Sequence, residues 1–311
     1  RTASKLLVDI LYPSAAPDPK IYISIVPWDH NVIVGSGYNA WVAAAPPSVI
    51  GALNVWAGTS FCPMAGAAVV HTHFRWNQDY VGQMRMRSNP NDLNEKNPAQ
   101  QIFAPFSTCM HADLYNAGVL VCTDYTMQCQ GHPNTLGPLR NDPALLKARL
   151  NGLQAAGATD SRRGLFWGWR TFSPNWQGWW SGVPAAMPKA YAAPDHYKAV
   201  VLMTDGLNNN VDGAYNPIPP GTTPGNSMPN VDYINARSKT LCSRMKDEGI
   251  RVYTIGFDLN ALSPAWRAIV EDYLKGCASS PSNYSPAPTP ATLVSVFSAI
   301  ASDLASLRIS Y

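Results

Sequence analysis

The sequence has few charged residues and no long apolar run. Only 14% of its 311 residues are charged, against ~25% in average proteins, so long solvated helices and charged tails are not expected. The 23 basic and 20 acidic residues nearly balance, which leaves no basic stripe for a phosphate backbone, and we expect no nucleic-acid partner. No stretch approaches the ~18 apolar residues of a membrane helix.

The beginning of the chain also lacks familiar signals. The residues from Arg1 to Lys5 do not have the pattern of a signal peptide, and there is no initiator methionine. We therefore expect a mature or truncated piece of a longer protein.

The six cysteines contain no C-x-x-C pair, so they lack the spacing of a zinc finger or a thioredoxin motif. An even count favours disulfides formed in an oxidising compartment, although a large domain can also bury free thiols. Four of the six lie in the middle of the chain and allow three pairings, among which the sequence does not choose. They are Cys62, Cys109, Cys122 and Cys129.

The two ends of the chain have regular patterns and the middle does not. Residues 3–11 place apolar side chains at helical spacing. Residues 20–28 are typical of a mostly buried strand, and residues 31–35 are a candidate to pair with it. Residues 36–136 are rich in Pro, Asn and Gly, so we expect an irregular, cysteine-containing insertion within a single domain that spans residues 1–311.

Three later helix starts share one signal, a capping side chain directly before a proline at the first helical position. The pairs are Asp142-Pro143, Ser263-Pro264 and Thr289-Pro290. Apolar residues then follow on one helical face: Leu146, Leu150 and Leu153 after the first start, and Leu293, Phe297, Ile300, Leu304 and Leu307 after the last.

Two apolar segments between these helices are typical of buried strands. Residues 198–203 and 251–257 show no polar alternation, and a predicted helix over residues 231–248, ended by Gly249, connects them. A strand–helix–strand unit with apolar strands indicates a parallel sheet covered on both faces. The sequence therefore predicts a doubly wound α/β domain.

Ligands of such sheets bind beyond the carboxyl ends of the strands. The strand that ends at Met203 leads into Asp205 and Gly206, and a carboxylate at this place can hold a hard cation, or can simply cap the next turn. Upstream, Thr159 is by itself only a candidate helix-start residue. In the helix that follows it, Gly168 would allow close approach to the sheet. Leu165, Trp169 and Phe172 would line one face of that helix.

Several motifs together resemble the von Willebrand factor A domain, and more narrowly the TadG-like proteins of the bacterial tight-adherence (Flp) pilus assembly system. The central ones are T-D-G-L-N-N at 204–209, G-A-T at 157–159 and G-L-F-W-G-W-R at 164–170. Further matches lie at 26–35, 136–146, 241–257, 277–280 and 297–310. The resemblance covers about residues 1–41 and 136–311.

The resemblance implies a cation site, usually for Mg²⁺, built from three loops: D-x-S-x-S, then a threonine, then an aspartate. By motif match, Thr159 is the threonine and Asp205 the aspartate. The chain contains no D-x-S-x-S, and Asp160-Ser161 lacks its spacing, so the first strand of the fold and its loop are missing from this sequence. We therefore expect a divalent cation only if such a loop exists upstream of Arg1.

The resemblance also pairs Cys242 with Cys277. It implies a non-enzymatic protein-binding or assembly module outside the cytoplasm, in the periplasm or on the cell surface. Its partners would be pilus or cell-envelope proteins, and the membrane anchor of the family would lie in an N-terminal segment that this chain lacks.

Two alternatives stay open. An enzyme is disfavoured, because His71-Thr72-His73 is a lone metal-type pair, Leu207 breaks a phosphatase D-x-D, and nucleotide-binding and hydrolase motifs are absent. The second is an extracellular adhesin that recognises protein or glycan through the insertion and a Trp-rich loop. Trp167 and Trp169 lie on a predicted core helix. Trp176, Trp179 and Trp180 follow a helix break, so they are candidates for exposure and for partner binding.

Overall fold

The computed structural model describes residues 1–28, 32–41, 91–103, 134–155, 159–208 and 228–309. Its α-helices are α1 (Thr2–Leu11), α4 (Pro143–Gly152), α5 (Ser161–Phe172), α6 (Met228–Asp247), α7 (Pro264–Cys277) and α8 (Pro290–Ile309). Its strands are β1 (Ile23–Ile25), β2 (Gly137–Arg140), β3 (Ala199–Thr204), β4 (Arg251–Phe257) and β5 (Tyr284–Ala287). Short 3₁₀ turns are η1 (Ser36–Trp41), η2 (Asn91–Leu93), η3 (Pro174–Trp176), η4 (Leu259–Ala261) and η5 (Pro281–Asn283). None of the helices within these ranges is long and apolar enough to span a bilayer.

The three predicted helix starts are confirmed, since α4, α7 and α8 each begin at the expected proline. Each preceding side chain accepts a hydrogen bond from a backbone N–H of the first turn, at 2.8 Å for Asp142, 3.4 Å for Ser263 and 3.1 Å for Thr289. These bonds satisfy N–H groups that have no partner inside the helix. After α6, Gly249 has φ +76°, the left-handed conformation expected of a glycine stop.

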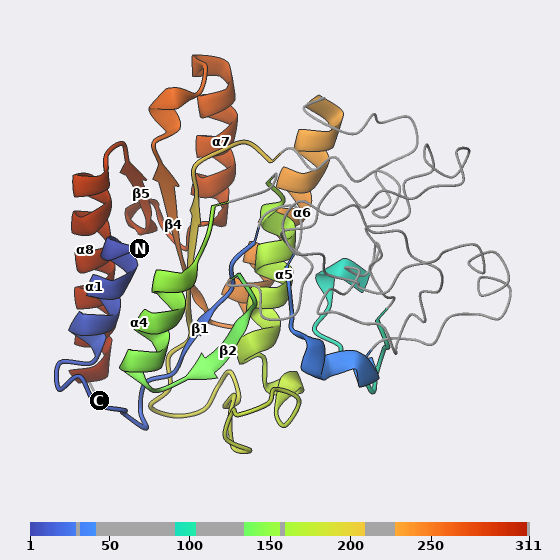
Figure 1. Ribbon diagram of the computed structural model, residues 1–311. Helices are drawn as coiled ribbons and strands as arrows, with labels where there is room; N and C mark the ends of the chain where they lie inside the picture. The colour runs from blue at the N-terminus through green and yellow to red at the C-terminus, as the bar shows by residue number, and fades with distance from the viewer. Residues whose placement is uncertain (29–31, 42–90, 104–133, 156–158, 209–227, 310–311) are drawn as a thin grey trace, which may run out of the picture.

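Two sheets make up the strand layer. β3, β4 and β5 are parallel in the order β3-β4-β5, while β1 pairs antiparallel with β2. Helices lie on both sides of this layer, with α1, α4 and α8 grouped on one side and α5 and α6 on the other (Figure 1). This arrangement confirms the predicted α/β class with a parallel sheet flanked by helices.

The first strand differs from its prediction. The ladder of β1 covers three residues rather than all of 20–28. Ile33 forms a parallel bridge with Thr135 and accepts a hydrogen bond from the N–H of Leu136 at 2.7 Å. Residues 32–35 therefore do not pair with residues 20–28, and that expectation was wrong.

Side chains of each strand alternate between two apolar cores. On the α1/α8 side, Tyr253 and Ile255 of β4 pack with Phe297 and Ile300 of α8. On the α5/α6 side, Val252 joins a separate cluster built from α5, α6 and α7. The domain thus has three layers, with β4 buried between the two helical layers.

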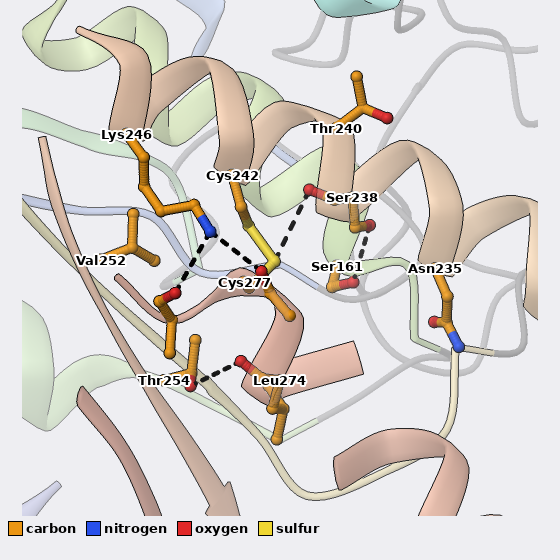
Figure 2. The surroundings of a disulfide bond; sticks show 12 residues. Ser161, Asn235, Ser238, Thr240, Cys242, Lys246, Val252, Thr254, Leu274 and Cys277 are labelled. Carbon is orange, nitrogen blue, oxygen red and sulfur yellow. Dashed lines mark hydrogen bonds between the residues drawn. A yellow bond between two sulfur atoms is a disulfide. The ribbon is translucent and has the colours of Figure 1, made fainter. Parts of the chain in front are cut away.

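The disulfide implied by the resemblance is present. Cys242 of α6 and Cys277 at the end of α7 are bonded, with Cα atoms 5.1 Å apart, and both are fully buried. Figure 2 shows Lys246 beside this bond, where its Nζ donates to the carbonyl oxygens of Gly276 and Ala278 at 3.0 and 3.2 Å. A cation at this position satisfies carbonyl groups left open by the end of α7. The other four cysteines lie outside the described residues.

Part of the expected insertion is anchored on the helices. Arg237 of α6 pairs with the buried carboxylate of Asp92, and Arg244 donates to the carbonyl oxygen of Leu93. Trp176 Nε1 donates to the carbonyl oxygen of Glu95 at 2.8 Å. Residues 42–90 and 104–133, with the His71/His73 pair among them, lie outside the described residues.

Candidate functional site

The two cation-ligand candidates come together at the carboxyl end of β3. Asp205 follows β3 directly and is exposed, and Gly206 continues the turn. Thr159 lies just before α5, with its Oγ1 3.9 Å from the position that a Cβ would take at Gly206. Two loops whose candidate residues are 46 positions apart in sequence therefore approach each other at the turn after β3.

A buried polar network fixes these loops to each other. The N–H of Ser161 donates to Asn208 Oδ1 at 2.9 Å, and Asn208 Nδ2 donates to Asn235 Oδ1 at 2.7 Å. The three residues belong to the start of α5, the loop after β3 and α6. Sequence reasoning missed this network. Its one local signal was the asparagine pair at the end of T-D-G-L-N-N, because an amide can donate and accept at the same time.

Next to this network lies a buried ionic cluster that was also missed. Asp160 is fully buried and contacts Arg162 at 2.9 Å and Arg163 at 3.3 Å, both of them buried as well. Burial raises the pKa of the Asp160 carboxyl, but the two guanidinium groups outweigh it and hold that pKa below its ordinary value. Asp160 therefore stays ionised and anchors the start of α5.

Thr159 and Asp205 do not by themselves fit a Mg²⁺ ion. They supply two protein oxygens, whereas Mg²⁺ takes about six ligands in octahedral geometry. Within the part of the chain that the structure describes, no group of three or more His, Cys, Asp or Glu side chains could hold a metal. A cation at this place needs further oxygen donors.

The tryptophans behave differently from the expected exposed loop. Trp176 and Trp180 are buried, and their rings stack with centroids 5.5 Å apart. Trp41 packs edge-on against both, at 5.3 and 5.1 Å. Only Trp179 of the three candidates keeps partial exposure. The expectation of an exposed Trp176 and Trp180 was wrong, because residues contributed by η1 and by 91–103 cover them.

The close approach expected at Gly168 occurs one turn earlier. A Cβ added at Gly164 would lie 2.4 Å from Trp28 Cδ1, whereas a Cβ at Gly168 would meet nothing within 4 Å. Gly168 instead borders a cavity of about 1770 Å³ that also reaches Thr159 and Asp205. The two candidate residues thus line part of a large cavity.

Comparisons with solved structures give fold likenesses at low sequence identity. The pilus adhesin SpaC of Lactobacillus rhamnosus GG shares 16% identity with a TM-score of 0.37, over 56% of this chain and 23% of that one. The von Willebrand factor domain of the type V pili tip protein Mfa5 of Porphyromonas gingivalis shares 16% with a TM-score of 0.36, over 54% and 75%. Proximal thread matrix protein 1 of the mussel byssus shares 17% with a TM-score of 0.27, over 55% and 29%.

These likenesses concern the fold alone, and this chain spans about a quarter of the length of SpaC. No family model matches the sequence, and no curated protein matches it either.

Proposed function

We propose that this chain is a non-enzymatic protein-binding or assembly module of von Willebrand A type that serves a bacterial tight-adherence (Flp) pilus system. The observation that supports the proposal is that the Thr159 hydroxyl lies close to the turn after Asp205, and that both residues line one cavity. These are the two residues to which the sequence resemblance assigns a cation-ligand role. The partners are pilus or cell-envelope proteins outside the cytoplasm, a location supported by the Cys242–Cys277 disulfide.

In this proposal Thr159 and Asp205 hold a divalent cation only when an additional loop supplies oxygen donors beside them. A D-x-S-x-S segment upstream of Arg1 is the loop that the resemblance implies. In its absence, the two residues act as a polar rim without metal, since two oxygens are too few for Mg²⁺.

Alanine at Asp205 tests the proposal, because this side chain is exposed and has no role in the core. In bacteria that carry the protein, Asp205→Ala should reduce the number of assembled surface pili, counted by electron microscopy, while the far-UV circular dichroism of the purified chain stays unchanged. Asp272→Ala is the matched control, since Asp272 is 77% exposed on α7 and its pair with Lys239 is a surface contact of little energy. Equal pilus numbers for Asp205→Ala and wild type would refute a role for Asp205.

The alternative, an adhesin that recognises protein or glycan through the insertion and the Trp-rich loop, now depends on Trp179 among the three tryptophans. Binding to a glycan array that is lost in Trp179→Ala and unchanged by a chelator would favour it over the pilus proposal.

A further inference from the structure

Two arginines and a tyrosine form a polar group away from the candidate site. Arg140 ends β2, Arg149 lies in the last turn of α4, and Tyr38 belongs to η1. None of these three residues lines the cavity that reaches Thr159 and Asp205. We call them the arginine patch.

The loop after α5 brings Arg140 and Tyr38 together. Arg140 Nη2 donates to the carbonyl oxygen of Ser181 at 2.8 Å, and the N–H of Ser181 donates to the Tyr38 hydroxyl at 3.3 Å. The Tyr38 ring packs against Trp41 and Trp180, with centroid distances of 4.1 and 5.4 Å. The aromatic cluster therefore fixes the ring, and one exposed residue holds the guanidinium and the phenol close to each other.

Arg149 approaches the same place over Gly137. A Cβ added at Gly137 would lie 2.8 Å from Arg149 Nε, so a side chain at position 137 would block this path. Next to this glycine, Arg149 Nη1 donates to the carbonyl oxygen of Thr135. The methyl group of Thr135 and the ring of Tyr38 both lie beside Gly35. The glycine in β2 thus allows an arginine of α4 to lie near η1.

The charges of the two guanidinium groups act on each other and on the tyrosine. Burial lowers the pKa of Arg149, and the charge of Arg140 lowers it further. Burial raises the pKa of Tyr38, while the hydrogen bond from Ser181 and both guanidinium charges oppose that rise. The patch therefore concentrates positive charge around one hydroxyl group.

Among the described residues, neither arginine of the patch has a carboxylate partner. Both donate to backbone carbonyl oxygens, and the nearest acidic residue in sequence, Asp142, uses its carboxylate to cap α4. No nitrogen of Arg140 or Arg149 is among the buried atoms without a partner. A guanidinium has more N–H donors than these bonds use, so the others face solvent.

Other half-buried or buried arginines of the domain are neutralised by the chain itself. Asp160 contacts both Arg162 and Arg163, and Asp92 pairs with Arg237. Two like charges held near each other in a half-buried place disfavour their charged forms, and an opposite charge reverses this effect. An anion from outside the chain would therefore stabilise both arginines of the patch.

We propose that the arginine patch binds the carboxylate side chains of an acidic segment of a partner protein. A guanidinium presents paired N–H donors that match the two oxygens of a carboxylate. The Tyr38 oxygen accepts from Ser181 and its own proton remains to be donated. Carboxylates are the acidic side chains of an unmodified protein. This inference rests on the proposed protein-binding function and names the chemistry that the partner presents.

A capped Gly-Glu-Glu-Gly peptide tests the proposal on the chain as it exists, and a capped Gly-Gln-Gln-Gly peptide is the uncharged control. The readout is the Nε–H signals of the arginine side chains in ¹H–¹⁵N NMR spectra. The glutamate peptide should shift the signals of Arg140 and Arg149, and the glutamine peptide should shift neither. Raising the salt from roughly 0.1 M to 1 M shortens the screening length from ~10 Å to ~3 Å and should weaken binding severalfold.

Three variants test the members of the patch. Arg140→Gln and Arg149→Gln each remove one charge but keep an N–H donor for the carbonyl contacts, and each should weaken peptide binding about tenfold. Tyr38→Phe keeps the ring, removes the hydroxyl and should weaken binding about fivefold. Arg267→Gln is the matched control, because Arg267 is also half-buried and donates to the amide oxygen of Asn260. It should bind as wild type does, and circular dichroism checks that all four variants fold.

Three results would overturn the inference: equal shifts with the glutamine peptide, shifts at Arg267 as large as those of the patch, or unchanged binding in folded Arg140→Gln and Arg149→Gln. Two further probes test the source of the anion. Succinate that binds as tightly as the glutamate peptide would overturn the assignment to a protein. Inorganic phosphate that shifts the two signals when the peptide does not would overturn the assignment to carboxylates.

This test and the pilus-assembly test can fail separately. Asp205 lies outside the arginine patch, so Asp205→Ala should bind the glutamate peptide as wild type does. Equal pilus numbers in Asp205→Ala would therefore leave the peptide result standing, and the absence of peptide binding would leave the role of Asp205 open to its own test.

Discussion

Gly164 and Gly168 lie one turn apart on α5 but have different surroundings, because Gly164 packs against Trp28 and Gly168 faces open space. An alanine at either position gains about the same helix propensity, ~1 kcal/mol over glycine. At Gly168 the added Cβ has no neighbour within 4 Å, so Gly168→Ala should raise the free energy of unfolding by about this amount. At Gly164 the same Cβ would lie 2.4, 2.6 and 2.7 Å from Trp28 Cδ1, Cγ and Nε1.

Ordinary contact begins at 3.4 Å, so about 1 Å of movement is needed between α5 and the indole ring. Overpacking of this kind costs about 1–3 kcal/mol. Because the propensity gain is common to both variants, it cancels in their difference. Gly164→Ala should therefore be less stable than Gly168→Ala by about 1–3 kcal/mol.

Urea unfolding followed by circular dichroism, with linear extrapolation and a check that the slope is unchanged, measures the two free energies. In a Trp28→Ala background the clash is absent, and the difference between the two glycine variants should shrink toward zero. If the free energies of unfolding of the two single variants agree within about 0.5 kcal/mol, the orientation of α5 that turns Gly164 toward Trp28 and Gly168 toward open space would be refuted. Such agreement would also contradict the position of Gly168 on the wall of the cavity.

Three further predictions concern stability. Removing the disulfide by Cys242→Ala with Cys277→Ala should cost about 4 kcal/mol on the loop-entropy scale, since 35 residues are closed; a loss below ~1 kcal/mol in denaturant titration would contradict it. Asp160→Asn leaves two buried guanidinium groups without their carboxylate and should cost about 3–5 kcal/mol at pH 7. Because folding lowers the pKa of Asp160, its contribution to stability is present above the unfolded pKa of about 3.9 and is lost as pH falls through the folded pKa. The melting temperature of Asp160→Asn should therefore fall less steeply with acidification than that of wild type. Asp142→Ala removes the cap of α4 and should lower the free energy of unfolding by ~1 kcal/mol. Asp142→Asn should lower it far less, because its side-chain oxygen can still accept the capping hydrogen bond.

Features with a local cause could be predicted from the sequence. The cap-proline pairs fix the starts of α4, α7 and α8, and Gly249 fixes the end of α6 through its positive φ. β5 was missed, because it has four residues and contains Pro286, which removes a donor and looks like a loop. It can be a strand because it lies at the edge of the sheet.

Features that depend on contacts between distant segments could not be predicted. The burial of Trp176 and Trp180 requires Trp41 from η1 and Glu95 from the insertion, and nothing near residues 176–180 signals these neighbours. Likewise, which glycine of α5 approaches the sheet depends on the rotation of the helix, and this is set by Trp28. Asp205 became a candidate from its place at the end of a buried strand, whereas Thr159 became one only because its motif resembles a known family.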